Sequence, residues 1–386
     1  MSAAKKKILV FIDWYLPGFK AGGPIKSCSS MVQRLHDEFD FRIVTGNTDL
    51  NESVQYQNIK SDEWNILEDK TPVFYCSAKS KNHASISKII EEQMPDVVYL
   101  NSMFSPWFTL VPLMVSGKYK NKIKIVVAPR GMLSPGALAL KPLKKKMFLH
   151  FAKLMRLFNN VTFHASTEIE VNEIKKVFGS KASIVHAINI TPKTEIQKQI
   201  RTKTSQLTRL VYVGRISEVK NLLQCIHALG SINIGSSKIE FDIYGPVDEI
   251  SYKQQCDEAI ARLSQNIKVN FKGAIDNNAI KAILPGYHFL LLLTMNENYG
   301  HAIVESFTAG LPVIISNRTP WRQLENACRG WDLPLEDSST ISAALEKACL
   351  MDQQEYNKWS DAAYEFADSI HNNKKTLSDT IRLFEN

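Results

Sequence analysis

The chain has 386 residues, which is too long for one ordinary hydrophobic core and suits two domains of Rossmann size. Hydrophobic residues make up 44% and charged residues 22%, which excludes a disordered or fibrous protein. The net charge of +8 predicts anionic partners, such as nucleotide phosphates, anionic lipid or nucleic acid, without choosing among them.

Cysteine spacing and apolar runs bear on the compartment. The six cysteines are scattered with no Cys-x-x-Cys pair, so we expect reduced thiols in a cytoplasmic protein. The apolar run at 8–12 ends at Asp13, which is too short for a signal peptide and predicts a buried strand. No apolar run approaches the roughly 20 residues of a membrane helix. We therefore expect a cytoplasmic protein, with docking at the inner face of the plasma membrane left open.

The first half alternates short β-rich runs with amphipathic stretches, which is typical of parallel α/β folding. Strands are expected at 7–12, 41–45, 96–100, 124–128, 161–164 and 183–188, and helices at 25–39, 84–93 and 143–158. No tight turn of the Asn-Gly type joins these strands, as expected where the connections are helical.

A polar stretch at 193–206 interrupts this pattern and is interpreted as a linker. Strands are then expected at 210–213, 241–244, 269–271, 289–293 and 313–315, with a helical tail from 352. The predicted fold class is α/β, with two Rossmann-like doubly wound domains facing across a cleft and C-terminal helices. The predicted division is an N-terminal domain at 1–190, a linker at 191–207, a C-terminal domain at 208–365, and a helix at 366–386 that crosses back to the N-terminal domain.

The segment 292–314 carries the most informative motif. A buried strand leads into a polar loop with Gly300, and backbone N–H groups around Gly300, His301 and Ala302 would suit a phosphate or sugar oxygen. Glu297 lies in the loop and Glu305 about one turn inside the following helix, so both carboxylates can converge on one ligand. Either glutamate alone would be interpreted as a surface charge. Their shared strand, turn and helix predict a ligand site.

Two other loops have features suited to phosphate. Arg215 and Lys220 follow the first strand of the second half, where a fork and a point charge can clamp a diphosphate. Gly22 and Gly23 precede the first helix and let the backbone approach a ligand closely. There is no G-x-G-x-x-G or Walker A pattern, so dinucleotide or ATP binding by those routes is unsupported.

These motifs resemble glycosyltransferase family 4, whose members are retaining enzymes of GT-B fold. The resemblance spans nearly the whole chain and rests on the paired glutamates, the Gly-Leu-Pro-Val-Ile at 310–314 and the Gly-Arg-x4-Lys-Asn at 214–221. The segments 128–133 and 163–168 are similar to the bacterial polysaccharide and lipopolysaccharide branch. The resemblance implies an acceptor-side N-terminal domain and a C-terminal domain that binds the nucleotide sugar.

The resemblance also assigns roles to residues. It implies that Arg215 and Lys220 bind the donor diphosphate, that Glu305 holds the ribose hydroxyls and that Glu297 touches the transferred sugar. The predicted catalytic residues are thus Arg215, Lys220 and Glu297, and the predicted donor-binding residues are Gly22, Gly23, Tyr299, Gly300, His301, Ala302 and Glu305.

The chain departs from the family pattern in two places. Glu297-Asn298-Tyr299-Gly300 replaces the common Glu-Gly-Phe-Gly, and Asn101-Ser102-Met103-Phe104 stands where many members place a histidine. The second departure puts acceptor-side detail in doubt. Candidate acceptor-side residues at strand ends are Asp13, Asn101, Arg130 and His164, with ion pairing for Arg130 and a buried hydrogen-bonded state for His164 as equal alternatives.

The stretch 141–158 predicts an amphipathic basic helix. It suits either a membrane-surface helix or a Rossmann helix that packs on the sheet. We expect a compromise, in which the apolar face of Leu143, Met147, Phe151, Leu154 and Phe158 packs inward while Lys144, Lys145 and Lys146 attract anionic head groups.

The predicted function is retaining transfer of a hexosyl-type sugar from a nucleoside diphosphate sugar to a hydroxyl acceptor. The setting suggested by the resemblance is bacterial capsule, O-antigen or lipopolysaccharide biosynthesis, with a glycan or lipid-linked acceptor. No Asp-x-Asp occurs, so we expect no metal and no cofactor. The alternative is a catalytically silent nucleotide-sugar-binding scaffold subunit. Nucleic acid is not an expected partner, because no recognition motif supports it.

Overall fold

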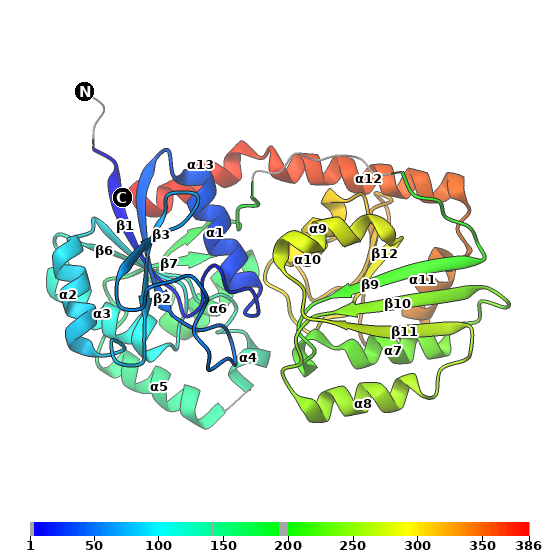
Figure 1. Cartoon of the computed structure of the whole chain (residues 1–386), viewed down its shortest axis with the longest axis horizontal. Helices are drawn as coiled ribbons and strands as arrows, with labels where there is room; N and C mark the ends of the chain where they lie inside the picture. Colours follow the sequence, from blue (N-terminus) through cyan, green and yellow to red (C-terminus); the bar gives the residue numbers. More distant parts are fainter. Residues whose placement is uncertain (1–3, 140–141, 193–199, 386) are drawn as a thin grey trace. The chain divides into compact units, whose positions relative to one another are not determined.

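The computed structural model describes residues 4–139, 142–192 and 200–385. The chain forms two compact units (Figure 1). Unit 1 comprises residues 1–193 and 373–386, and unit 2 comprises residues 194–372.

Unit 1 is built on an eight-stranded sheet in the order β3-β4-β2-β1-β5-β6-β7-β8. All neighbouring pairs are parallel except β3 and β4. Residues 8–11 of the central strand β1 and all of its neighbour β5 are buried apolar runs, as expected for a parallel sheet covered on both faces. The strands are β1 Lys6–Phe11, β2 Phe39–Gly46, β3 Trp64–Ile66, β4 Pro72–Cys76, β5 Val97–Leu100, β6 Lys124–Val127, β7 Thr162–Ala165 and β8 Ser183–His186.

Helices connect these strands and cover both faces of the sheet (Figure 1). They are α1 Gly23–Leu35, α2 His83–Gln93, α3 Val111–Ser116, α4 Pro135–Ala139, α5 Pro142–Leu154, α6 Glu168–Phe178 and the C-terminal α13 Lys374–Glu385, with short π and 3-10 turns at Pro106–Leu110 and Gly117–Tyr119.

The C-terminal helix α13 completes the core of unit 1. Phe384 is buried and its ring lies 5.2 Å from that of Phe39 and 5.9 Å from those of Phe41 and Tyr99. The tail predicted as one helix from 366 is divided, because α12 ends at His371 and Asn373 caps a new helix by accepting from the N–H groups of the following turn.

Unit 2 contains a six-stranded parallel sheet in the order β11-β10-β9-β12-β13-β14. Its strands are β9 Leu207–Val213, β10 Lys238–Tyr244, β11 Ile267–Gly273, β12 Phe289–Leu292, β13 Val313–Ser316 and β14 Gly330–Leu333. Its helices are α7 Leu222–Ser231, α8 Ile250–Ile260, α9 Asn277–Ile283, α10 His301–Thr308, α11 Ser338–Leu350 and α12 Gln353–His371, with 3-10 turns at Glu218–Lys220 and Leu284–Gly286.

Part of the predicted linker proves to be integral to unit 2. Residues 193–199 lie outside the described residues, but Arg201 and Lys203 beyond them are buried. The Arg201 guanidinium donates to the backbone carbonyls of Ala309 and Gly310, and the Lys203 ammonium donates to that of Cys349 at 2.9 Å. The part of the predicted linker that the structure describes therefore includes two buried cations that donate to backbone carbonyl groups of unit 2.

The orientation of α5 is also opposite to the expectation. Phe158 is buried, but Leu143, Met147, Phe151 and Leu154 are exposed, and the buried side of the helix is formed by Leu149 and Ala152. Among the described residues, no helix is both long and apolar enough to span a membrane.

Candidate functional site

The predicted catalytic residues of unit 2 lie where β9 and β12 end. These strands are neighbours in the sheet and run parallel, so the loops that follow them leave the same edge. Arg215 and Lys220 belong to the loop after β9, and Glu297 belongs to the loop between β12 and α10. The topology thus brings two distant parts of the sequence, the loop with Arg215 and Lys220 and the loop with Glu297, to one edge of the sheet.

Backbone contacts hold the two loops together. The N–H of Met295 donates to the carbonyl of Val219 at 2.9 Å, and the side-chain amide of Asn221 donates to the carbonyl of Leu293 at 2.9 Å. Asn221 has a φ of 56°, a left-handed conformation that asparagine tolerates better than most residues. This turn ends the short 3-10 helix that carries Lys220 and starts α7.

Lys220 and Glu297 form an ion pair between these loops. The side chains are only 20% and 17% exposed, so water screens the pair less than it would a surface pair. The backbone N–H of Glu297 also donates to the carbonyl of Arg318 at 3.0 Å, which ties the loop to the end of β13. The pair is a partly desolvated cation and anion at one point of the sheet edge, and two of the three predicted catalytic residues are in direct contact.

Arg215 has a partner that the sequence did not indicate. Its guanidinium donates to the carboxylate of Asp248 at 2.6 Å, and Asp248 is the less exposed of the two. Asp248 lies in the loop after β10, the strand on the other side of β9. A single aspartate in a Gly-Pro-Val-Asp turn has no motif of its own. Its position after a parallel strand was the only available signal.

Close packing of the β9 and β10 loops positions this second pair. Gly245 has a φ of 154°, and a Cβ atom there would lie 1.8 Å from the carbonyl oxygen of Gly214. The N–H of Ile216 donates to the carbonyl of Pro246 at 2.9 Å. Only glycine permits this approach of the two backbones, which brings Asp248 within reach of Arg215.

The helix α10 starts at the end of the loop that carries Glu297. Gly300 has a φ of 81°, and its carbonyl accepts from the N–H groups of Ile303 and Val304 at 2.9 and 3.1 Å. His301, Ala302 and the half-buried Glu305 lie in the first turns of this helix. Glu297 lies in the loop directly before this helix. The positive end of the helix dipole therefore follows Glu297 in the chain, and a helix N-terminus favours an anionic ligand.

The ring of Tyr299 is buried beneath the protein surface, next to the start of α10. The residue is 3% exposed, and its ring lies 4.9 Å from that of His301 and 5.6 Å from that of Trp321. The indole N–H of Trp321 donates to the carbonyl of Tyr299, and burial raises the pKa of the phenol above its ordinary value. The ring of Tyr299 therefore packs within unit 2, and a contact between this residue and the donor stays a prediction.

Three of the predicted acceptor-side residues of unit 1, Asn101, Arg130 and His164, belong to a hydrogen-bonded network at the carboxyl ends of its central strands. Arg130 donates from Nε to the side-chain oxygen of Asn101 at 2.7 Å and from a terminal nitrogen to the Tyr99 hydroxyl at 2.7 Å. A third bond reaches the side-chain oxygen of Asn189. Tyr99 and Asn189 were missed, because neither belongs to a motif.

His164 is a buried member of the same network. Its Nε2–H donates to the carbonyl of Ala187 and its Nδ1 accepts from the Tyr99 hydroxyl, both at 2.8 Å. Burial, and secondarily the positive charge of Arg130, lower its pKa to about 3, so the ring is neutral. Both ring nitrogens are engaged within unit 1, which favours the structural alternative for His164 over acceptor contact.

Asp13 and the glycine loop lie after β1. The Asp13 carboxylate accepts from the Ser105 hydroxyl at 2.6 Å, and burial raises its pKa above the ordinary value. Gly22 has a φ of 67° and starts α1, and a Cβ atom there would contact nothing within 4 Å. The backbone of Gly22 is therefore unobstructed, and donor binding by this loop stays a prediction. In the described part of the chain, no group of three or more His, Cys, Asp or Glu side chains is arranged to hold a metal ion.

Known proteins resemble this chain in sequence and in fold. The sequence model of the family described as "Glycosyl transferases group 1" matches residues 193–366. A UDP-N-acetylglucosamine–peptide N-acetylglucosaminyltransferase GtfA subunit from Streptococcus agalactiae is 23% identical over 221 residues, which are 55% of this chain and 42% of that protein. The chain thus matches less than half the length of this curated relative.

Solved structures with the same fold cover nearly the whole chain. HepE from Anabaena, in complex with UDP and glucose, superposes with a TM-score of 0.72 at 15% identity and covers 98% of both chains. WaaG, a glycosyltransferase involved in lipopolysaccharide biosynthesis, gives a TM-score of 0.68 at 16% identity and also covers 98% of both chains. These structures show that the fold is GT-B, and the family match covers residues 193–366, nearly all of unit 2.

Proposed function

We propose that this protein is a retaining glycosyltransferase that moves a sugar from a nucleoside diphosphate sugar to a hydroxyl acceptor. The observation that carries the proposal is the pairing of Lys220 with Glu297 beside Arg215, at the carboxyl edge of two adjacent parallel strands. Phosphate ligands of open α/β sheets bind at this edge. All three residues lie in the segment that matches the glycosyltransferase family.

Arg215 and Lys220 are proposed to hold the donor diphosphate. The bond between the anomeric carbon and the terminal phosphate oxygen breaks, and negative charge grows on the departing diphosphate. Two fixed cations stabilise that charge and can take the place that a divalent metal has in other glycosyltransferases, so the proposal needs no metal or cofactor. Because each cation already has a carboxylate partner, neither has to be ordered when the donor arrives.

The acceptor hydroxyl attacks the same face of the sugar that the diphosphate leaves. Its oxygen bonds to the anomeric carbon, and its proton passes to a phosphate oxygen of the leaving group, which conserves the anomeric configuration. Glu297 accepts hydrogen bonds from hydroxyls of the transferred sugar, and Glu305 accepts those of the ribose. Lys220 thus lies between a sugar-binding carboxylate and the phosphate, and couples the two halves of the donor.

The biological setting is proposed to be bacterial cell-surface glycan biosynthesis in the cytoplasm, with a hexosyl donor of family 4 type and a glycan or lipid-linked acceptor. Support comes from the fold shared with WaaG, a glycosyltransferase involved in lipopolysaccharide biosynthesis, and with HepE, whose structure was solved in complex with UDP and glucose. The Asn298-Tyr299 variant next to Glu297 is the place where sugar preference would differ from that of relatives.

The second candidate is a catalytically silent scaffold subunit that binds a nucleotide sugar. Asn101 stands where many family 4 members have a histidine. In this structure the side-chain oxygen of Asn101 accepts a hydrogen bond from Arg130. The S. agalactiae relative is itself named as a subunit. Donor binding without product from a broad acceptor panel would favour this candidate.

The test compares Arg215→Ala and Lys220→Ala with Arg209→Ala. Arg209 lies on the same strand β9 but pairs with Glu240 away from the proposed site, so it is a matched control for loss of a paired arginine. A panel of nucleoside diphosphate sugars is screened by calorimetry, and turnover of the bound donor is followed by mass spectrometry. We expect each site variant to lose roughly 100-fold or more in turnover and the control to retain it. Near-full activity of both site variants would disprove the mechanism.

A further inference from the structure

The helix α5 exposes an apolar stripe. Leu143, Met147, Phe151 and Leu154 are 72%, 64%, 59% and 72% exposed, and Met155 extends the row. Their spacing of four, four and three residues puts them on one side of the helix. Single exposed side chains of this size are common on protein surfaces. Five of them along one side of a helix form an apolar patch, and such patches mark interaction sites.

The opposite side of α5 already fills its place in the core. Leu149 and Ala152 are buried, and the ring of Phe148 lies 5.4 Å from that of Phe104. Lys145 also folds back, donating to the carbonyl of Ala137. Helix α5 therefore packs on the core of unit 1 through its other side, and the stripe takes no part in that packing.

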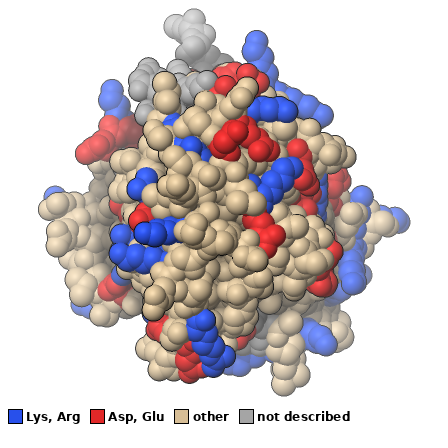
Figure 2. Space-filling model, turned by 90° about the vertical axis from the view of Figure 1, so that its right-hand side faces the viewer, with Lys and Arg blue, Asp and Glu red and all other residues tan. Residues whose placement is uncertain are grey.

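Cations border the stripe. Lys146 and Lys153 lie along one flank and Lys144 along the other, and all three are exposed. The sequence holds no Asp or Glu between Asp96 and Glu168, a stretch with 11 Lys and Arg residues. The face in Figure 2, by contrast, carries side chains of both signs next to one another. An apolar stripe bordered by lysines fits a surface that is apolar inside and anionic at its boundary.

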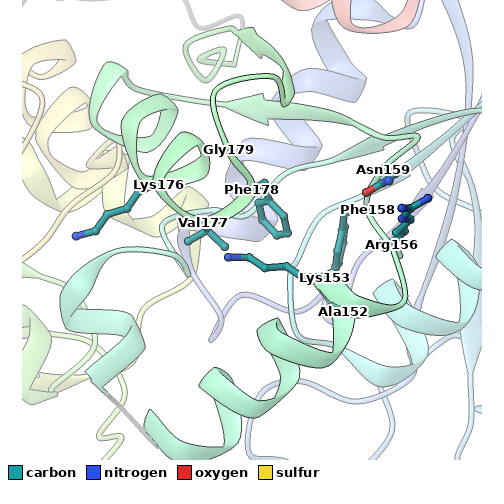
Figure 3. Close-up of a pocket in the computed structure, with 9 residues that line it drawn as sticks. All are labelled: Ala152, Lys153, Arg156, Phe158, Asn159, Lys176, Val177, Phe178 and Gly179. Atoms are coloured by element: carbon teal, nitrogen blue, oxygen red, sulfur yellow. The ribbon is translucent and has the colours of Figure 1, made fainter.

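A basic pocket lies at the end of the same helix (Figure 3). It has a volume of about 490 Å³ and is lined by Lys153 of α5, by Arg156 and Asn159 of the following turn, and by Lys176 of α6. The rings of Phe158 and Phe178 belong to its wall, with centroids 5.3 Å apart and planes inclined by 55°. Figure 3 shows Lys153 and Lys176 reaching out on one side and Arg156 beyond the Phe158 ring. Three cations around an aromatic wall suit the phosphate and glycerol of a lipid head group.

We propose that α5 docks unit 1 on an anionic phospholipid bilayer. The stripe enters the boundary between head groups and acyl chains, the bordering lysines contact lipid phosphates, and the pocket takes the head group of one anionic lipid. The surface lies in unit 1, whereas the proposed donor residues Arg215, Lys220 and Glu297 lie in unit 2. Lipid docking therefore does not depend on the proposed transferase reaction.

The experiment is flotation of the full chain with phosphatidylglycerol-containing vesicles and with pure phosphatidylcholine vesicles, without donor. We expect binding to the anionic vesicles only, weakened by salt. Met147→Glu and Phe151→Glu should each lower the partition coefficient roughly tenfold, since each removes one buried apolar side chain from the contact. Lys146→Gln and Lys176→Gln should each lower it about fivefold.

Matched controls separate docking from misfolding. Ile250→Glu places a charge on an exposed apolar residue of α8 in unit 2, and Lys268→Gln removes an exposed lysine of β11; both should bind vesicles as the parent chain does. Thermal unfolding should be unchanged in all variants. Equal binding to both vesicle types, or unchanged binding of Phe151→Glu, would overturn the proposal. So would self-association in sedimentation velocity that Phe151→Glu abolishes without any vesicle binding, because the stripe would then join two copies of the chain.

Discussion

The two units share a doubly wound architecture but differ in charge. Unit 1 has 30 Lys and Arg residues against 18 Asp and Glu, a formal net charge of +12, whereas unit 2 has 17 against 21, a net charge of −4. The basic character of the chain therefore comes from the unit that carries α5. The proposed diphosphate site lies in the acidic unit, where two cations are each held by a carboxylate.

This difference separates two uses of positive charge. In unit 2 the charge is local: Arg215 and Lys220 are placed by paired loops and act at one sheet edge. In unit 1 it is diffuse and spread over a long acid-free stretch, which suits a large anionic surface more than a small ligand. Net charge alone could not have distinguished these uses.

The largest expected effect tests whether the units are energetically separate. Phe384→Ala should remove a buried ring from the core of unit 1 and lower its stability by about 3 kcal/mol. Calorimetry should show one of two transitions shifted to lower temperature. Phe366→Ala is the counterpart, because this residue of α12 packs on Phe307 and Trp321 in unit 2 and should shift only the other transition. A single transition displaced equally by both changes would show that the units unfold together.

The next effect concerns two buried histidines, His164 in unit 1 and His288 in unit 2. Burial lowers the pKa of His164 to about 3 and that of His288 to about 4, against an ordinary value of 6.5. The unfolded chain thus binds protons near pH 6.5, whereas the folded chain does not. The free energy of unfolding is therefore highest above pH 6.5 and falls as the pH is lowered toward 4.

Between pH 6.5 and pH 5 this loss should amount to about 2 kcal/mol for each histidine. Urea unfolding followed at several pH values measures it. His164→Gln should flatten the acid dependence of unit 1 and His288→Gln that of unit 2. An unchanged slope in both variants would mean that other groups cause the acid sensitivity.

The smallest effect concerns the positioning residue Asp248. Asp248→Asn keeps an oxygen near Arg215 but removes the charge, so the guanidinium should be held less firmly. We expect the KM for the donor to rise roughly threefold to tenfold while kcat changes little. Glu240→Gln is the matched control, since it weakens the Arg209 pair between the same two strands. Equal kinetics for the two variants would remove Asp248 from the site.

Much of the fold followed from the alternation of strand and helix patterns. The GT-B architecture is shared with the solved neighbours, and the predicted strands overlap the observed ones. Strands β3 and β4 were both missed; β3 is a three-residue, half-exposed run that pairs antiparallel with β4. Strand β14 was missed because its four residues start at a glycine with a φ of 139° and include a half-buried aspartate.

The candidate site was predictable where a motif carried it. Glu297, Arg215 and Lys220 stand at strand ends, and the parallel topology brings strand ends together whatever the intervening sequence. Asp248, Tyr99 and Asn189 were not predictable, since each acts through a partner that is distant in the sequence. Tyr299 was assigned to the ligand because it adjoins Glu297, but packing against Trp321 turned its ring inward.

The sequence by itself determined the two-unit α/β fold class, the strand-end motifs and the amphipathic nature of α5, because these depend on local periodicity and spacing. Only the tertiary structure decided which side of α5 meets the core and which carboxylate holds Arg215. Periodicity states that a helix has two faces but not which of them finds partners. That choice depends on the shapes of other elements, and in this protein it left the apolar face outside.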